Sequence, residues 1–506
     1  MYRCLTVPHP PRAVTVAIAL VTSLLPASGL RAQTSWAGRA RLQPEQCVAA
    51  TGNGEAWIQR AIAATGMSRI EGAVVFEGSE SSIQFYQSDR PYPPYIGATS
   101  SIRFTFDPAS GTERRLTMPP GGAPGRSVLM TPTAAFGIRG DTTLIPIPRF
   151  YEFYEPSRFL NPLAVLADWR SEDVTVVATC DFRGYPRVVL SRGRTGERLY
   201  LQTGSAVPVK YERIEPHYLW GQVLAEYVYT TWWQAGPVML PVTTARYIDG
   251  VEELHRDLDF SSQSLGETVP LASAWPALPV PAVDQRASTG WLSTPQPVDT
   301  VRVGDNTYLL TTPTYTHAVT MAKDTVFLFD ATTAEWRSQA DSAWIAKLFP
   351  GRHAMVLVVT DLAWPHIAGV RFWAARGAAI ATHPLSIPFL TRVIDRRWEL
   401  TPDIRNTTLP QTPSMLPIGS RQSFGGGAVH LAPIDGVASE GALMAWLPSA
   451  KFLWAGDYIQ SATSPTVYAR EVISATQREG FTPVQAAAQH LKLTAWSTIL
   501  ETNAMP

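Results

Sequence analysis

The sequence has no excess of charge of either sign. Its 506 residues include 42 Lys and Arg and 42 Asp and Glu, so the formal net charge at pH 7 is zero. Proteins that bind nucleic acids usually carry a basic patch or tail that contacts phosphates. No such patch or tail is visible in this sequence, and we expect no nucleic-acid partner.

Cysteine is scarce, with three residues in the whole chain: Cys4, Cys47 and Cys180. No pair has the C-x-x-C spacing, and no Cys/His pattern has the spacing of a zinc site, so thiolate metal sites and dithiol redox motifs are excluded. In an oxidising compartment Cys47 and Cys180 could form a disulfide. Sequence cannot give the distance between them, so a disulfide and two free buried thiols both remain open.

Long apolar runs are absent except near the N-terminus. Arg3 and Arg12 precede the apolar run of residues 13–25, and small residues lead to a plausible cleavage point after Ala32. This pattern predicts a secretory signal peptide over residues 1–32, because a membrane span needs about 18 or more apolar residues. An uncleaved anchor helix is the alternative. We expect an exported protein, periplasmic or extracellular, with no transmembrane span after signal removal.

Several motifs that carry catalysis are also missing. The chain has no G-x-S-x-G nucleophile elbow, no P-loop and no dinucleotide-binding fingerprint. The short run Gly425-Gly426-Gly427 is most simply a turn. Serine hydrolases of the α/β-hydrolase type and the common nucleotide-binding folds are therefore excluded.

The first half of the chain has the pattern of antiparallel strands. After a flexible stretch from 33 to about 50, apolar residues at helical spacing predict a short helix over 55–65 with Asn53 as its cap. From 72 to about 262, short runs rich in Val, Ile, Tyr, Phe and Thr alternate in period two and are separated by turn residues. We assign a β-rich domain to residues 33–285 and a Pro-rich linker to residues 286–300.

This arrangement, a helix followed by a long antiparallel meander behind a signal, resembles the half-barrel of periplasmic lipoprotein-carrier proteins. The resemblance implies an open barrel that could hold an acyl chain. A scaffold domain with an ordinary core is the alternative reading of the same pattern.

Strands and helices alternate from Val301 onward, which is typical of α/β layering. The most informative stretch is residues 356–373, where an apolar strand ends at Thr360, a loop follows, and a helix begins near Gly369. In open α/β sheets, ligands bind at the carboxyl ends of such strands. We assign a second domain to residues 301–506, which makes the whole chain α+β or α/β in class.

Three stretches of this second domain resemble the metallo-β-lactamase superfamily. The loop T-D-L-A-W-P-H-I-A-G, residues 360–369, is similar to the superfamily pattern T-H-x-H-x-D-H-x-G-G. The run K-F-L-W-A-G-D, residues 451–457, is similar to its K-V-L-F-A-G-D strand, and His490 precedes a closing helix as a late His does there. The resemblance covers about residues 301–500 and implies a four-layer αββα sandwich.

Members of this superfamily bind two zinc ions and use a bridging hydroxide as nucleophile. The resemblance places Asp361 at the first His of the loop and Ala363, which cannot ligate a metal, at the second. Pro365 stands at the loop Asp and has no donor atom, whereas the last loop His is retained as His366.

The remaining ligand positions are also incomplete. Asp457 matches the bridging Asp, and His490 matches the last His. The middle His belongs in residues 436–440, which contain none; Glu440 or Asp435 could approach but neither matches. Most ligands of a dinuclear site are therefore missing.

Three hypotheses remain. The leading one is an exported metallo-β-lactamase-fold protein with a degenerate site and no cofactor, acting by binding or structurally. The second is a single-metal hydrolase, with one zinc ion on His366, Asp457 and His490 and with Asp361 nearby, because two His and one carboxylate form a legitimate zinc set. The third is a lipid- or lipoprotein-handling protein that uses the first domain. The small-molecule or lipid ligand, the substrate and the oligomeric state stay open.

Overall fold

The computed structural model describes most of the chain beyond residue 45. The described residues are 46–83, 97–119, 125–139, 143–147, 154–170, 173–182, 184–193, 196–217, 219–274, 295–396, 398–399, 402–407 and 412–504. The predicted signal peptide (1–32) and most of the predicted linker (286–300) lie outside these residues. We call residues 46–274 the β-rich segment and residues 295–504 the C-terminal segment.

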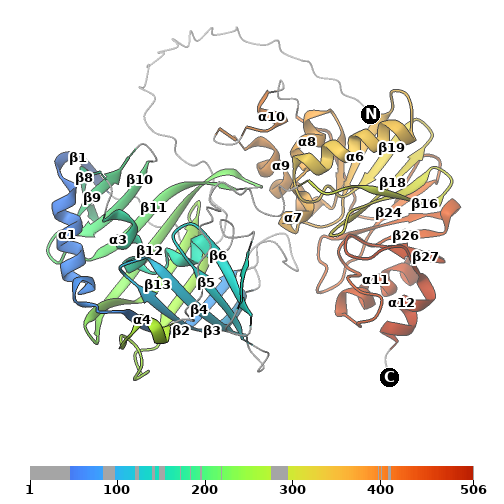
Figure 1. Ribbon diagram of the computed structural model, residues 1–506. Coiled ribbons are helices and arrows are strands. Elements are labelled where there is room, and N and C mark those ends of the chain that lie inside the picture. The colour runs from blue at the N-terminus through green and yellow to red at the C-terminus, as the bar shows by residue number, and fades with distance from the viewer. Residues whose placement is uncertain are drawn as a thin grey trace, which may run out of the picture. The chain divides into compact units, whose positions relative to one another are not determined.

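The β-rich segment forms one large antiparallel sheet (Figure 1). The strand order is β1-β8-β9-β10-β11-β12-β13-β14-β2-β3-β4-β5-β6-β7, with β15 also paired to β2, so two meanders join where β14 pairs with β2. The strands are β1 (Gln46–Asn53), β2 (Ala73–Ile83), β3 (Gly97–Asp107), β4 (Thr112–Met118), β5 (Arg126–Met130), β6 (Ala135–Arg139), β7 (Thr143–Pro146), β8 (Val174–Phe182), β9 (Tyr185–Arg192), β10 (Glu197–Gln202), β11 (Pro208–His217), β12 (Gly221–Ala235), β13 (Val238–Ile248), β14 (Val251–Leu258) and β15 (Thr268–Val269). The helices are α1 (Gly54–Ala64), α2 (Glu155–Arg158), α3 (Pro162–Trp169) and α4 (Leu271–Ala274), with a 3-10 turn at Met67–Arg69.

Local sequence rules account for these elements. Strand β12 buries alternate residues from Gly221 to Tyr229, as the period-two pattern predicts for a half-buried strand. Helix α1 begins after Asn53, whose side chain accepts a hydrogen bond from the Ala56 backbone N–H at 3.1 Å, as predicted. The expected flexible stretch up to about residue 50 is wrong from Gln46 onward, because β1 pairs with β8 there.

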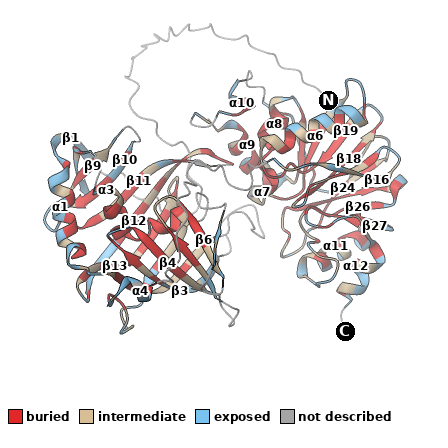
Figure 2. Ribbon diagram, in the orientation of Figure 1, coloured by how far each residue is buried: buried red, intermediate tan, exposed pale blue. Residues whose placement is uncertain are grey.

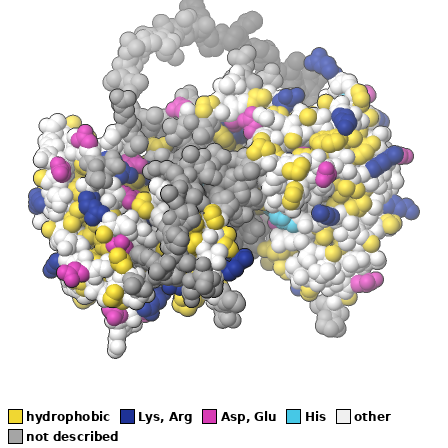
Figure 3. All heavy atoms as spheres, in the orientation of Figure 1, with side chains coloured by type: hydrophobic (Ala, Val, Ile, Leu, Met, Phe, Trp, Pro, Cys, Tyr) yellow, Lys and Arg dark blue, Asp and Glu magenta, His cyan; other side chains and the backbone are white. Residues whose placement is uncertain are grey.

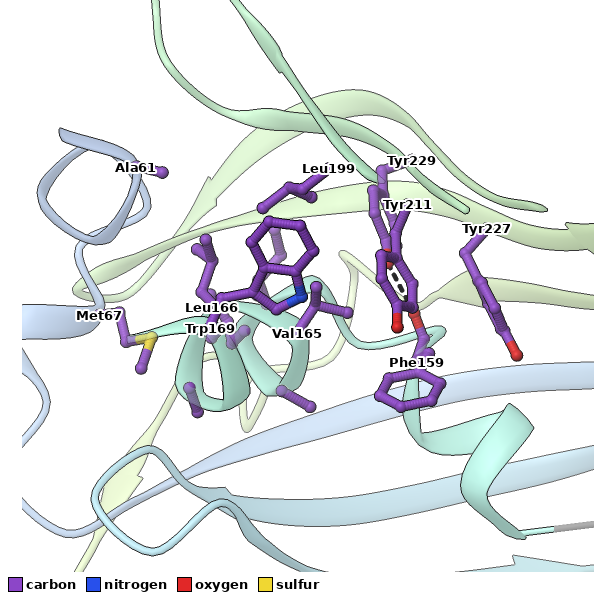
Figure 4. Close-up of a cluster of buried hydrophobic side chains, with 14 of the residues drawn as sticks. Ala61, Met67, Phe159, Val165, Leu166, Trp169, Leu199, Tyr211, Tyr227 and Tyr229 are labelled. Atoms are coloured by element: carbon purple, nitrogen blue, oxygen red, sulfur yellow. Dashed lines mark hydrogen bonds between the residues drawn. The ribbon is translucent and has the colours of Figure 1, made fainter. Parts of the chain in front are cut away.

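The apolar core of the β-rich segment lies between the sheet and helices α1 and α3. Figure 4 shows Trp169 of α3 among Val165, Leu166 and Leu199. The hydroxyl of Tyr229 donates to the Phe159 backbone carbonyl at 2.8 Å, so a buried phenol has its partner. The described interior of this segment is thus occupied by its own helices and aromatic rings.

Buried ion pairs accompany this apolar core. Glu80 of β2 is 9% exposed and forms ion pairs with Arg115 of β4 and with Arg256 of β14, the latter at 2.7 Å. Glu215 of β11 pairs in the same way with Arg246 of β13 at 2.6 Å. Charges that leave water need partners of this kind, and each of these pairs joins two strands that are not consecutive in the sequence.

A disulfide joins Cys47 of β1 to Cys180 of β8, which settles the alternative that the sequence left open. The two residues are direct partners in the antiparallel register, and 133 positions separate them along the chain. A bond that closes so long a loop restricts the unfolded chain strongly.

We expect the double substitution Cys47→Ser/Cys180→Ser to lower the free energy of unfolding by about 2–4 kcal/mol. Urea denaturation followed by circular dichroism measures this loss. A reductant should destabilise the wild type by a similar amount and leave the double variant unchanged. Equal stability of wild type and variant would contradict the expectation.

The C-terminal segment contains two sheets and seven α-helices among its described residues (Figure 1). The first sheet has the order β16-β17-β18-β19-β20-β21-β22 and is parallel from β19 onward. The second has the order β23-β24-β25-β26-β27-β28, with β26 and β27 parallel. The strands are β16 (Asp299–Gly304), β17 (Thr307–Thr311), β18 (Thr316–Ala322), β19 (Thr325–Phe329), β20 (Ala354–Val359), β21 (Ala379–Thr382), β22 (Met415–Pro417), β23 (Gln422–Phe424), β24 (Val429–Pro433), β25 (Leu443–Leu447), β26 (Phe452–Trp454), β27 (Gln485–Ala487) and β28 (Thr494–Ala495), and the helices are α6 (Glu335–Leu348), α7 (Trp364–Ile367), α8 (Val370–Ala375), α9 (Ile387–Asp395), α10 (Ile404–Thr407), α11 (Val467–Arg478) and α12 (Trp496–Asn503).

Three apolar clusters hold this segment together. One joins the two sheets and includes Phe327 and Val358 of the first and Leu431 of the second. Another joins the first sheet to α6, α8 and α9, and a third joins the second sheet to α11 and α12. Strand β25 is buried at every position, and β19 at every position but its first. Figure 2 shows buried residues along the central strands of this segment. Strands covered on both faces read as continuous apolar runs, as β19 and β25 do.

The predicted α+β class is confirmed at the level of several sheets and fewer helices. One prediction for this segment is wrong: the stretch between Thr360 and Gly369, expected as a loop, contains the short helix α7. Among the described residues, no helix combines the length and the apolar character needed to cross a membrane. On the face shown in Figure 3, acidic and basic side chains are interspersed among the described residues.

Candidate metal centre

The candidate centre begins at the carboxyl end of β20. Thr360 follows this strand, and both its backbone N–H and its hydroxyl donate to the carboxylate of Asp330 at 2.8–2.9 Å. The indole N–H of Trp454 donates to the same carboxylate at 3.0 Å. Asp330, the residue after β19, therefore links the ends of β19 and β20 to β26 next to this loop.

His366 lies on the short helix α7 and is 2% exposed. Neighbouring backbone groups fix this helix, because the N–H of Ala331 donates to the His366 carbonyl and the N–H of Thr333 donates to the Pro365 carbonyl. Gly369 then starts α8 in close contact with Ala331 and Ser338: a Cβ at Gly369 would lie 2.2 Å from the Ser338 hydroxyl oxygen. The glycine at this position is thus required by packing.

Asp457 and His490 come from the other sheet. Asp457 follows β26 and His490 follows β27, and these two strands are parallel neighbours, so their carboxyl ends meet. The turn before Asp457 needs Gly456, which has φ +57° and packs against Thr360, where a Cβ would lie 2.4 Å from the hydroxyl oxygen. Packing at Gly456 therefore brings the end of β26 against the end of β20.

One side-chain nitrogen or oxygen atom from each of His366, Asp457 and His490 lies within 4.8 Å of the others. Among the described residues, this is the one group of three or more His, Cys, Asp or Glu that meets such a distance. The Tyr315 ring packs against both imidazoles, with centroid distances of 5.6 Å to His366 and 4.9 Å to His490. The three residues predicted as ligands of a single metal ion are therefore close together, and the Tyr315 ring packs beside two of them.

The chemistry of this group fits a divalent cation. The Oδ1 atom of Asp457 is buried and has no hydrogen-bond partner among the described residues, although His490 Nε2 lies 3.5 Å away. A buried carboxylate oxygen without a partner is costly. Two imidazoles and one carboxylate are a ligand set that zinc accepts.

Asp361, the fourth predicted site residue, lies outside this group of three. Its Oδ1 accepts a hydrogen bond from the Ala363 backbone N–H and lies 2.9 Å from His366 Nδ1, and its Oδ2 accepts from Gln489 Nε2 at 2.8 Å. Both carboxylate oxygens are thus engaged with protein groups.

The two imidazoles have opposite electrostatic environments. Burial disfavours the charged form of His366, but the carboxylates of Asp361 and Asp457 outweigh burial and raise its pKa to about 9. Burial and the adjacent His366 lower the pKa of His490 to about 4. Burial, reinforced by Asp361 and only partly offset by His366, raises the pKa of Asp457 to about 6. The metal-free site therefore holds its positive charge on His366, beside two acidic side chains.

A second metal would need ligands that the described structure does not bring to this place. Ala363 and Pro365 have no donor side chains. In residues 436–440 the Ser439 hydroxyl donates to Glu471 of α11 at 2.6 Å, which holds this loop against the helix. Asp435 lies near Arg478 at 3.7 Å, and neither it nor Glu440 belongs to the group of three.

Two residues of the site carried no signal in the sequence. Tyr315 precedes β18, and Gln489 is an uncharged neighbour of His490. A third feature, the buried dyad of His317 and Asp341 at 2.6 Å, supports the loop at residues 331–333, because His317 Nε2 accepts from the Thr332 backbone N–H at 3.0 Å. These contacts join segments far apart in sequence, so no local pattern indicates them.

Comparison with known proteins gives a likeness of structure only. No family model matches the sequence, and no curated protein matches it. Similar solved structures include DIM-1 metallo-β-lactamase (15% identity, 41% of this chain and 95% of that chain, TM-score 0.33) and TMB-1 (15% identity, 41% and 96%, TM-score 0.33). Another is the metallo-β-lactamase from Erythrobacter litoralis (14% identity, 40% and 94%, TM-score 0.32). At such identities the likeness concerns the fold of about two fifths of the chain.

Proposed function

We propose that this protein is a hydrolase that uses one metal ion, bound by His366, Asp457 and His490. The observation that carries the proposal is the convergence of these three side chains within 4.8 Å around a buried carboxylate oxygen that lacks a hydrogen-bond partner. Zinc is the first candidate because two imidazoles and one carboxylate suit it.

The number of ligands favours catalysis over a structural role. Structural zinc sites are closed by four protein ligands, whereas catalytic sites have three and leave a position for water or substrate. This cluster offers three residues, and the carboxylate of Asp361 is already engaged by His366, Ala363 and Gln489. The alternative of a protein that only binds or supports is therefore the weaker of the two.

Zinc bound there would lower the pKa of a coordinated water and polarise a substrate carbonyl. Side chains of the protein make two further contributions. His366 and Asp457 provide opposite charges at the site, and the Tyr315 ring, which packs against both imidazoles, restricts the rotation of His366 and His490. The substrate class stays open.

The proposal has three further parts. The three apolar clusters of the C-terminal segment have the layer order helix, sheet, sheet, helix, which supports a four-layer αββα sandwich of the metallo-β-lactamase type with one metal position retained. The long antiparallel sheet supports a half-barrel in the β-rich segment. The disulfide supports export to an oxidising compartment, periplasmic or extracellular. The hypothesis of a lipid- or lipoprotein-handling protein gains no support from the described residues.

Metal analysis and turnover test the proposal together. The purified protein, freed of metal with a chelator and reconstituted with zinc, should retain one zinc ion per chain by elemental analysis. Hydrolysis of a panel of esters, thioesters and lactams should depend on that ion. Absence of bound zinc, or two ions per chain, would overturn the proposal. One ion without turnover of any panel member would overturn the hydrolase and leave a metal-binding protein.

A further inference from the structure

Both carboxylate oxygens of Asp361 are in contact with protein groups. Its Oδ1 lies 2.9 Å from the Nδ1 atom of His366 and accepts from the Ala363 backbone N–H at 2.9 Å. Its Oδ2 accepts from the side-chain amide of Gln489 at 2.8 Å. Asp361 is 6% exposed. A carboxylate with three protein partners is already held in place without any ion.

The contact with His366 decides which ring nitrogen can ligate. When Nδ1–H donates to Asp361, Nε2 is the ring nitrogen that remains to bind a metal ion, once its own proton has left. Metal-binding His residues commonly donate their other N–H to a carboxylate, which fixes the tautomer and the ring orientation. The pair of Asp361 and His366 has this arrangement.

The contact with Gln489 connects Asp361 to the other two ligands. Gln489 is fully buried, and its backbone N–H donates to the carbonyl of Gly456, the residue before Asp457, at 2.8 Å. Its carbonyl accepts from the Thr316 N–H at 2.8 Å. Gln489 therefore connects Asp361 to the segment that contains His490 and to the turn that contains Asp457.

We propose that Asp361 is a positioning residue of the metal centre: it holds His366 with Nε2 toward the ion and, through Gln489, fixes the segment of Asp457 and His490 against α7. This inference rests on the proposed single-metal site and goes beyond it, because it gives a supporting role to a residue that the sequence resemblance places among the ligands.

The test is zinc affinity of the full chain, measured by competition with a chromophoric chelator. Asp361→Asn preserves the shape of the side chain but removes its charge, and its zinc affinity should fall by about 10- to 100-fold. One zinc ion should still bind at saturation, since no ligand is lost. Asp435→Asn, at an acidic residue outside the cluster, is the matched control and should bind zinc as the wild type does.

A spectroscopic measurement separates positioning from general loss of structure. In the zinc-loaded wild type, the 15N chemical shifts of His366 should show Nδ1 protonated and Nε2 metal-bound, and Asp361→Asn should weaken this signature. If Asp361→Asn fails to fold, Gln489→Met removes the Oδ2 contact, leaves the contact between Asp361 and His366 in place, and should lower zinc affinity several-fold.

The outcomes distinguish the two proposals. A wild type that binds no zinc overturns the proposed function. A wild type that binds one zinc ion, with folded Asp361→Asn equal to it in affinity and in His366 signature, overturns the positioning role alone. Unchanged affinity of Gln489→Met would overturn the connection to the His490 segment.

Discussion

Replacing His366 with Ala should reduce zinc affinity by at least about 100-fold, because structural zinc sites with four ligands are worth about 10–16 kcal/mol and one ligand therefore contributes about 3 kcal/mol. His366 is buried on α7, so no other side chain replaces it at the same place. Chelator competition on the full chain measures the effect. Turnover of any substrate found should fall in parallel.

The matched control is His430→Ala. His430 lies on β24, its Nδ1 is 2.7 Å from the Ser423 hydroxyl, and it is not part of the group of three. Its replacement should leave zinc affinity unchanged. Equal losses in both variants would point to non-specific binding of zinc by imidazoles and would contradict a centre built on His366.

The second large effect concerns stability. Replacing Glu80 with Gln should lower the free energy of unfolding by about 3–5 kcal/mol, because it removes the carboxylate that forms ion pairs with the buried Arg115 and Arg256. Glu80 lies where β2 pairs with β14, and Arg256 is its direct register partner. The ion pairs therefore span the junction of the two meanders. Urea denaturation at pH 7 measures the loss.

The effect of Glu80 should also depend on pH. Burial pushes the pKa of Glu80 upward, but Arg115 and Arg256 outweigh burial and hold it below its usual value near 4.5. The unfolded chain therefore binds the proton more readily than the folded chain, and the stabilisation is fully present above pH 4.5. It is lost as the pH falls through the lower pKa of the folded state, so the difference between wild type and Glu80→Gln should shrink below pH 4.5.

Glu77→Gln is the control on the same strand. Glu77 pairs with Arg103 at 2.6 Å, but the Arg103 side chain is 46% exposed, and solvent-exposed pairs contribute about 0–1 kcal/mol. Its replacement should cost far less than that of Glu80. If both variants lost the same stability, burial would not be the source of the Glu80 effect.

The sequence indicated the elements of this protein where the signal was local. Helix α1 with its Asn53 cap and the alternating strand β12 follow from periodicity and capping. Helix α7 was missed because four residues are too short to show a helical period. The start of β1 was missed because its pairing with β8, which includes the disulfide, joins distant parts of the chain.

By itself, the sequence determined the α+β class and named His366, Asp457, His490 and Asp361 as site residues. Only the tertiary structure decided that three of them converge while Asp361 binds His366 and Gln489. The physical reason is that hydrophobic periods specify which face of a strand or helix is buried, and contacts between strand ends depend on the order and register in which strands pair. Residue type identified the possible metal ligands in the sequence. The parallel pairing of β26 with β27 brings Asp457 and His490 together in the fold, next to His366.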